Sequence, residues 1–141
     1  MPKKHGSAHW EGGLKDGKGR VSMESGALND QPYGFNTRFE GKPGTNPEEM
    51  IAAAHASCFS MALSMVLGDS DLTPSSIDTK ATVTLDEVDG GFAVTKSHLD
   101  VTVSVPDASD EDVLAACETA KANCPISKLL ATEITMDAKV S

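Results

Sequence analysis

Residues 46–68 read NPEEMIAAAHASCFSMALSMVLG and contain one long segment between two helix boundary signals. Asn46 is a good N-cap, the proline after it suits the first helical position, and Glu49 falls three residues after Asn46, as in a capping box. Gly68 is a typical C-terminal stop. These signals predict a helix over residues 47–67.

The predicted helix has no formal charge between Glu49 and Asp69, a length that could span a bilayer. Three serines, a histidine and many alanines make the segment only weakly apolar, however, and no basic flank orients it. The pattern therefore predicts a central helix covered on most sides. Because a chain of this size has few residues to cover such a helix, we expect a second subunit.

Strand patterns precede this helix. The turn-rich segment GGLKDGKG, residues 12–19, predicts a hairpin loop between two short strands. In YGFNTRFE, residues 33–40, aromatic and threonine side chains alternate with other residues, which predicts a third strand with one polar face. Arg38 is then expected to point away from the aromatic side.

The remainder of the chain predicts an antiparallel hairpin, two helices and a last strand. A change of phase in the second hairpin strand predicts a bulge near residues 95–98. This order favours an α+β domain over repeated βαβ units, with residues 1–141 forming one domain. The predicted elements are strands over 77–85 and 99–105, a helix over 109–122, a short helix from Cys124-Pro125 and a strand in EITMDAKV.

Composition limits the possible partners and compartments. Among 141 residues, 21 acidic against 12 basic residues give a net charge of -9, which disfavours nucleic acid and anionic membranes as partners. The first residues lack the apolar region of an export signal, so we expect a cytoplasmic protein. Three cysteines cannot all pair within one chain, and a reducing compartment favours a transient, catalytic disulfide over a structural one.

Cys58 has three interpretations, of which core packing is favoured by spacing alone, because buried free cysteine is common. A metal site would join His55 and Cys58 with Cys117, Cys124, His5 or His9, although the chain has no CxxC pair. A reactive thiol is the third. Helical spacing places Cys58 on one face with six other residues: Ile51, Ala54, His55, Met61, Ala62 and Met65.

The second thiol favours exchange chemistry. Cys124 immediately precedes Pro125, so its sulfur is expected at a helix N-cap, where free N–H groups favour a thiolate. Cys117 lies on the expected buried face of the preceding helix and is interpreted as inert filler. From its sequence position alone, Arg38 is interpreted as an ordinary solvent-exposed strand residue that can pair with Glu40 on the same face.

Four stretches together resemble a known family. QPYGFNTRFEG, GTNPEE, AAAHASCFSMALS and NCPISKLL, in this order and at these separations, are similar to the OsmC branch of the OsmC/Ohr family of thiol peroxidases. The resemblance implies an OsmC-like fold, with antiparallel sheets around a long central helix, in an intertwined homodimer. It also implies reduction of organic hydroperoxides, and of hydrogen peroxide less well, without metal, haem or other cofactor.

The resemblance also implies residue roles. Carried over position by position, it makes Cys58 the peroxidatic thiol and Cys124 the resolving thiol. Arg38 becomes the cation beside the thiolate, and Glu49 becomes the carboxylate that orients Arg38. Cys117 has no role in this scheme.

The implied cycle runs from a Cys58 sulfenic acid to a Cys58–Cys124 disulfide. An external dithiol, for which the family suggests a lipoyl-bearing protein or a small dithiol, would then reduce the disulfide. Apolar side chains would favour a bulky organic peroxide over a small polar one. Those expected to line the site are Met61, Met65 and either Phe39 or Phe59.

Glu49 and Cys58 are expected to act in different subunits. Nine residues separate them on the predicted helix, about 13.5 Å along its axis and roughly 180° around it. We therefore expect Glu49 to come from the partner subunit, with each active site at a two-fold interface. The alternative from another class is a non-catalytic small-ligand binding protein on the same scaffold, in which Cys58 is only a packing residue.

Overall fold

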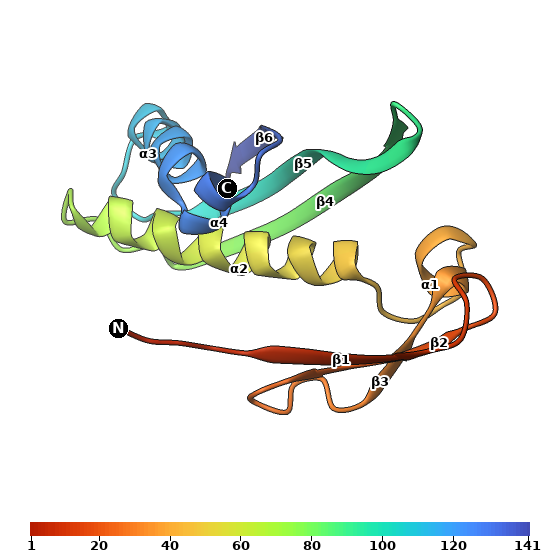
Figure 1. The fold of residues 1–141 in the computed structure, drawn as a ribbon. Coiled ribbons are helices and arrows are strands. Elements are labelled where there is room, and N and C mark those ends of the chain that lie inside the picture. The colour runs from red at the N-terminus through yellow and green to blue at the C-terminus, as the bar shows by residue number, and fades with distance from the viewer. The chain divides into compact units, whose positions relative to one another are not determined.

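The computed structural model describes residues 1–141 and has the predicted α+β composition (Figure 1). Internal contacts divide the chain into two compact units, Met1–Met50 and Ile51–Ser141, where the sequence predicts one domain. The first unit contains a small sheet and a short helix, and the second contains the core helix, the other sheet and two further helices.

The N-terminal unit is built on a three-stranded antiparallel sheet in the order β1-β2-β3, which confirms the first two predicted strands. Trp10 on β1 and Tyr33 on β3 have ring centroids 5.7 Å apart. Gly19 lies beneath them, and a Cβ there would come within 2.6 Å of the Tyr33 ring and 2.8 Å of Trp10. The strands are β1 (Gly6–Glu11), β2 (Lys18–Met23) and β3 (Gln31–Tyr33).

The predicted strand over residues 33–40 is wrong, because β3 ends at Tyr33 and a short helix, α1 (Phe35–Phe39), follows. Thr37 Oγ1 accepts the backbone N–H of Gly34 at 3.0 Å. The rings of the first and last helix residues lie 4.8 Å apart, as side chains four apart on a helix do. The alternation of aromatic residues therefore fits a helix face as well as a strand face.

The long helix is α2 (Pro47–Gly68), close to its predicted bounds. Asn46 caps it as predicted, since its Oδ1 accepts the Glu49 backbone N–H at 2.8 Å. By length and composition α2 could cross a membrane. Within the C-terminal unit, however, every fourth residue from position 55 is buried in a core of other elements, which identifies a core helix. These residues are His55, Phe59, Leu63 and Leu67.

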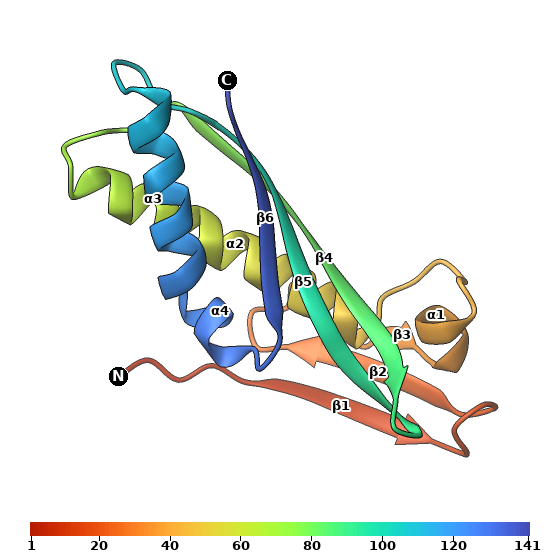
Figure 2. The same cartoon turned by 90° about the horizontal axis from the view of Figure 1, so that it is seen from above.

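The C-terminal sheet has the order β4-β5-β6, with β5 in the centre (Figure 2). The hairpin turn is Asp89-Gly90, whose φ values of 50° and 81° suit a two-residue primed turn. The register shifts by one residue at Thr95, which confirms the predicted bulge. The strands are β4 (Ser76–Val88), β5 (Gly91–Ser104) and β6 (Glu133–Val140).

β6 runs parallel to β5, so this sheet is mixed rather than antiparallel. Parallel neighbours need a crossover, which here is formed by α3 (Asp110–Asn123) and α4 (Pro125–Leu129). Both helices confirm the predicted elements. The inner face of β5 joins α2 and α3 in one apolar core, in which Leu99 and Val113 are fully buried.

The start of α3 offers a test of local stability. Ser109 is its N-cap, and Ser109 Oγ accepts the Asp112 backbone N–H at 3.1 Å. We expect Ser109→Ala to lower the free energy of unfolding by about 1 kcal/mol, because that N–H loses its partner. Ser109→Asn, which retains a capping oxygen, should unfold within a few tenths of the parent value in urea. Equal losses for both variants would show that the cap does not stabilise the helix.

Candidate active site

The structure brings two of the three thiols together. Cys58 is half-buried on α2, and Cys124 is fully buried at the corner where α3 ends and α4 begins. A hydrogen bond links the two side chains, and the backbone N–H of Ile126 donates a second one to the Cys58 sulfur. All cysteines are free thiols. Cys58 and Cys124, the two thiols predicted to react with each other, are therefore in direct contact as free thiols.

The surroundings of Cys58 favour its protonated form. Burial raises the pKa of the Cys58 thiol above its usual value, the hydrogen bond to Cys124 raises it further, and only the Ile126 N–H lowers it. A buried thiol forms a nucleophilic thiolate at neutral pH when a positive charge lies beside it. A neighbouring cation would therefore be needed to form the Cys58 thiolate at neutral pH, and no cation of the C-terminal unit acts on the Cys58 pKa.

Cys117 is the third thiol and is separate from this pair. It is fully buried on α3, in the core cluster. Burial raises its pKa to about 11, so it is a protonated packing residue at neutral pH. The expected burial of Cys117 on α3 is confirmed.

The N-terminal unit presents the predicted cation, but with a different partner. Arg38 Nη2 donates to Glu48 Oε1 at 2.7 Å, and Arg38 Nε donates to the same carboxylate at 3.1 and 3.2 Å. The guanidinium also lies over the Phe39 ring, 5.3 Å from its centroid, rather than away from the aromatic side chains. The Glu48 side chain is 13% exposed, whereas Glu49 is at the surface.

Within one chain Arg38 thus pairs with Glu48 rather than Glu49, and the role of the partner subunit's Glu49 stays a prediction. Consecutive residues on a helix differ by about 100° in direction, so only one of two neighbouring carboxylates can face α1. The sequence places both in the first turn of α2 and does not distinguish them.

His55 is the residue near the thiols whose role sequence reasoning missed. Its Nδ1 lies 2.6 Å from Ser97 Oγ on β5, and its Nε2 lies 2.7 Å from Ser127 Oγ on α4. Burial lowers the pKa of His55, so the ring is neutral at neutral pH. Both ring nitrogens are occupied by serines, which leaves His55 without a nitrogen for the metal site considered from sequence. The signal available in the sequence was the four-residue spacing of His55 from Phe59, Leu63 and Leu67, which puts one polar side chain in line with three apolar ones.

The prediction that Cys58, Met61 and Met65 share one face of α2 with His55 is only partly correct. Met61 and Met65 are 77% and 66% exposed, on a side of α2 that the described chain leaves open. Phe59, considered as a lining residue, is instead fully buried in the core. Cys58 lies at the border between the buried stripe and the open side, which suits a thiol that must meet a substrate.

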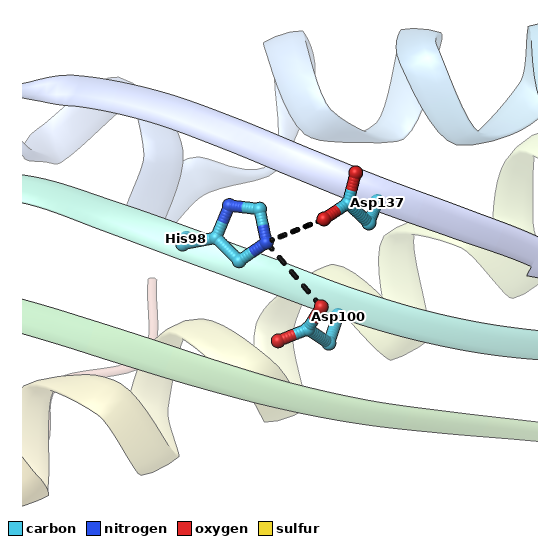
Figure 3. Close-up of side chains that lie close together, drawn as sticks. All are labelled: His98, Asp100 and Asp137. Carbon is cyan, nitrogen blue, oxygen red and sulfur yellow. Dashed lines mark hydrogen bonds and ion pairs between the residues drawn. The ribbon is translucent and has the colours of Figure 1, made fainter.

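Another cluster of potential ligands lies on the outer face of the C-terminal sheet (Figure 3). His98 Nε2 lies 3.3 Å from Asp100 Oδ1 and 3.2 Å from Asp137 Oδ2. The other ring nitrogen lies 2.6 Å from Thr135 Oγ1. Lys80 occupies the same row of the sheet, opposite Asp100. We interpret the cluster as cross-strand pairing between β5 and β6.

The family model for OsmC-like protein matches residues 39–139, across both units. The chain belongs to the OsmC family. Among OsmC family relatives, Peroxiredoxin OsmC of Escherichia coli is 62% identical over 136 residues, covering 95% of this chain and 94% of the relative. Organic hydroperoxide resistance protein OhrB of Bacillus subtilis is 32% identical over 123 residues, covering 86% and 87%.

Solved structures agree with the OsmC family fold. The crystal structure of OhrB of Bacillus subtilis superposes with a TM-score of 0.67 at 26% identity, covering 97% of this chain and 98% of that one. An organic hydroperoxide resistance protein OsmC from Legionella pneumophila gives a TM-score of 0.73 at 22% identity, covering 100% and 98%. The second likeness concerns the fold alone.

Proposed function

We propose that this OsmC family chain is a cysteine-based peroxidase that reduces organic hydroperoxides, and hydrogen peroxide less well, to the alcohol or water. The observation that carries the proposal is the contact between the Cys58 and Cys124 thiols, which come from elements far apart in the sequence. The names of the relatives, a peroxiredoxin and organic hydroperoxide resistance proteins, support the same activity. A packing role for Cys58, which the ligand-binding alternative requires, would not need this contact.

The proposed cycle begins at Cys58. Its thiolate attacks the outer peroxide oxygen, so that an S–O bond forms and the O–O bond breaks. The alkoxide leaves and takes up a proton to become the alcohol. The Cys124 sulfur then attacks the Cys58 sulfenic acid, the S–S bond forms, and the hydroxyl leaves as water with the Cys124 proton. An external dithiol, such as a lipoyl-bearing protein, supplies two electrons and two protons to restore both thiols.

Arg38 is proposed as the cation beside the Cys58 thiolate. Its pairing with Glu48 fixes the direction of the guanidinium, which is the function expected from sequence for Glu49. A positive charge beside the sulfur would oppose the effect of burial on the Cys58 pKa. No metal, haem or other cofactor enters this scheme.

We further propose that the protein is a cytoplasmic homodimer in which both units form one OsmC-like domain. The family match across residues 39–139 supports a single domain. The open side of α2 carries Met61 and Met65, large apolar side chains that a second copy would cover. Nucleic acid and membranes are not expected partners of a chain with a net charge of -9.

Disulfide mapping tests the proposed function. After one equivalent of cumene hydroperoxide, we expect peptide mass spectrometry to find Cys58 linked to Cys124 and Cys117 unmodified. Contact between the first two thiols and the raised pKa of the third predict this pairing. A protein that keeps all three thiols would be a binder rather than a peroxidase. A dominant bridge to Cys117 would instead assign the resolving role to that residue.

A further inference from the structure

The contacts between α2 and α4 form two parallel links. Cys58 meets Cys124, and His55 meets Ser127 at 2.7 Å. The residues of each helix that make these links are three positions apart, about one turn. The N–H of Ile126 also reaches the Cys58 sulfur from the same turn of α4. The imidazole link thus lies one turn from the pair of thiols on both helices.

His55 also has an anchor outside the two helices. Ser97 on β5 holds the Nδ1 side at 2.6 Å, and Ser97 is itself fully buried in the sheet. The ring, its two hydroxyl partners and Cys124 are all buried, so water replaces none of these contacts without opening the core. Buried hydrogen bonds of this kind specify one arrangement of the elements that they join.

We propose that His55 is a positioning residue for the resolving step, which holds the first turn of α4 so that the Cys124 sulfur faces Cys58. The inference rests on the proposed peroxidase cycle and assigns to His55 no contact with the peroxide. When the His55–Ser127 link is lost, the Cys58 sulfenic acid still forms but waits longer for Cys124. A longer wait exposes the sulfenic acid to a second peroxide and to oxidation beyond recovery.

The two nitrogens of the ring allow matched variants. In His55→Gln the side-chain amide reaches the position of Nε2 and retains the link to Ser127, whereas in His55→Asn it reaches only the position of Nδ1. Ser127→Ala and Ser97→Ala remove the two partners separately. Each of the four variants removes one buried hydrogen bond of residue 55. Only His55→Asn and Ser127→Ala remove the bond that joins this residue to α4.

The experiment measures two rates by quenching with dimedone and by intact mass after one equivalent of cumene hydroperoxide. We expect His55→Asn and Ser127→Ala to form sulfenic acid at the wild-type rate and to form the disulfide about 5- to 100-fold more slowly, as expected for loss of a buried hydrogen bond. Excess peroxide should then give more sulfinic acid. His55→Gln and Ser97→Ala should resolve within about threefold of wild type.

Each outcome decides between the two proposals. If Cys58 is not oxidised in the wild-type protein, the proposed function fails. If Cys58 is oxidised and Ser127→Ala resolves as fast as wild type, the positioning role fails while the peroxidase cycle stands. Equal slowing in all four variants would indicate general loosening of the core and would also overturn the proposal. Thermal unfolding identifies any His55 variant that does not fold, and the two serine variants then carry the test.

Discussion

Cys58→Ser is expected to reduce peroxidase turnover to the uncatalysed background, because a serine hydroxyl lacks the nucleophilicity of a thiolate. Cys124→Ser should consume one equivalent of cumene hydroperoxide and then stall with a trapped sulfenic acid, because no second thiol lies against Cys58. Peroxide consumption over several equivalents with dithiol present measures the effect of Cys58→Ser. Consumption without added thiol, with dimedone to trap the sulfenic acid, measures the stall of Cys124→Ser.

Cys117→Ala is the matched control for these two variants. Its side chain is buried in the core and separate from the thiol pair, so we expect normal turnover with some loss of stability. Repeated turnover by Cys58→Ser would remove Cys58 from the peroxidatic role. A disulfide from Cys58 to another cysteine in Cys124→Ser, formed without added thiol, would assign resolution to that residue.

Arg38→Met is expected to slow oxidation of Cys58 by about 10- to 1000-fold at pH 7, because a neighbouring cation lowers the pKa of an acidic group by about 1–3 units. Burial raises the pKa of Cys58, so without Arg38 the thiolate forms only at higher pH. The rate of thiol loss measured from pH 6 to pH 10 should therefore shift toward alkaline pH in the variant. An unchanged pH profile would show that Arg38 does not lie beside the thiolate.

The two neighbouring glutamates distinguish the prediction from sequence from the arrangement in the structure. Glu48→Gln should slow oxidation about tenfold, since it weakens a charged hydrogen bond that is partly exposed to solvent. Glu49→Gln, at the exposed neighbouring position, is the matched control and should remain near the wild-type rate. The reverse order would restore Glu49 as the orienting carboxylate.

A mixed dimer extends the Arg38 prediction to the question of shared sites. Chains carrying Cys58→Ser and Arg38→Met can be co-expressed with two different tags and purified as the heterodimer. If each site combines residues of both subunits, one of the two sites regains an intact Cys58 and Arg38, with about half the wild-type activity. If the heterodimer is as inactive as its parents, both residues act within one chain.

Local signals in the sequence predicted the elements that carry the thiols. The cap at Asn46, the Cys124-Pro125 junction and the bulge near Thr95 were all correct, since each depends on residues close in sequence. The helix over 35–39 was missed because a five-residue helix with aromatic ends shows the same alternation as a strand. The direction of β6 could not be read locally, because it depends on the crossover before it.

Only those residues of the candidate site that belong to a family motif could be predicted from the sequence. The choice of Glu48 over Glu49 depends on the direction of the first helical turn relative to α1. The partners of His55 lie 42 and 72 positions along the chain, beyond the reach of any local pattern. Resemblance to a family identified the thiols, whereas the contacts that hold them depend on tertiary packing.

The junction between α3 and α4 has a consequence for competition inside the cycle. Cys124 is the single extended residue between the two helices, with φ -53° and ψ 129°, and the proline that follows restricts it to that conformation. A stiff corner loses little conformational entropy when the disulfide closes, so the effective concentration of the second sulfur at the first is high. The peroxide concentration would have to exceed that effective concentration before a second peroxide molecule could intercept the sulfenic acid. In the proposed cycle, the backbone at this corner would therefore help to set the peroxide concentration above which Cys58 is over-oxidised.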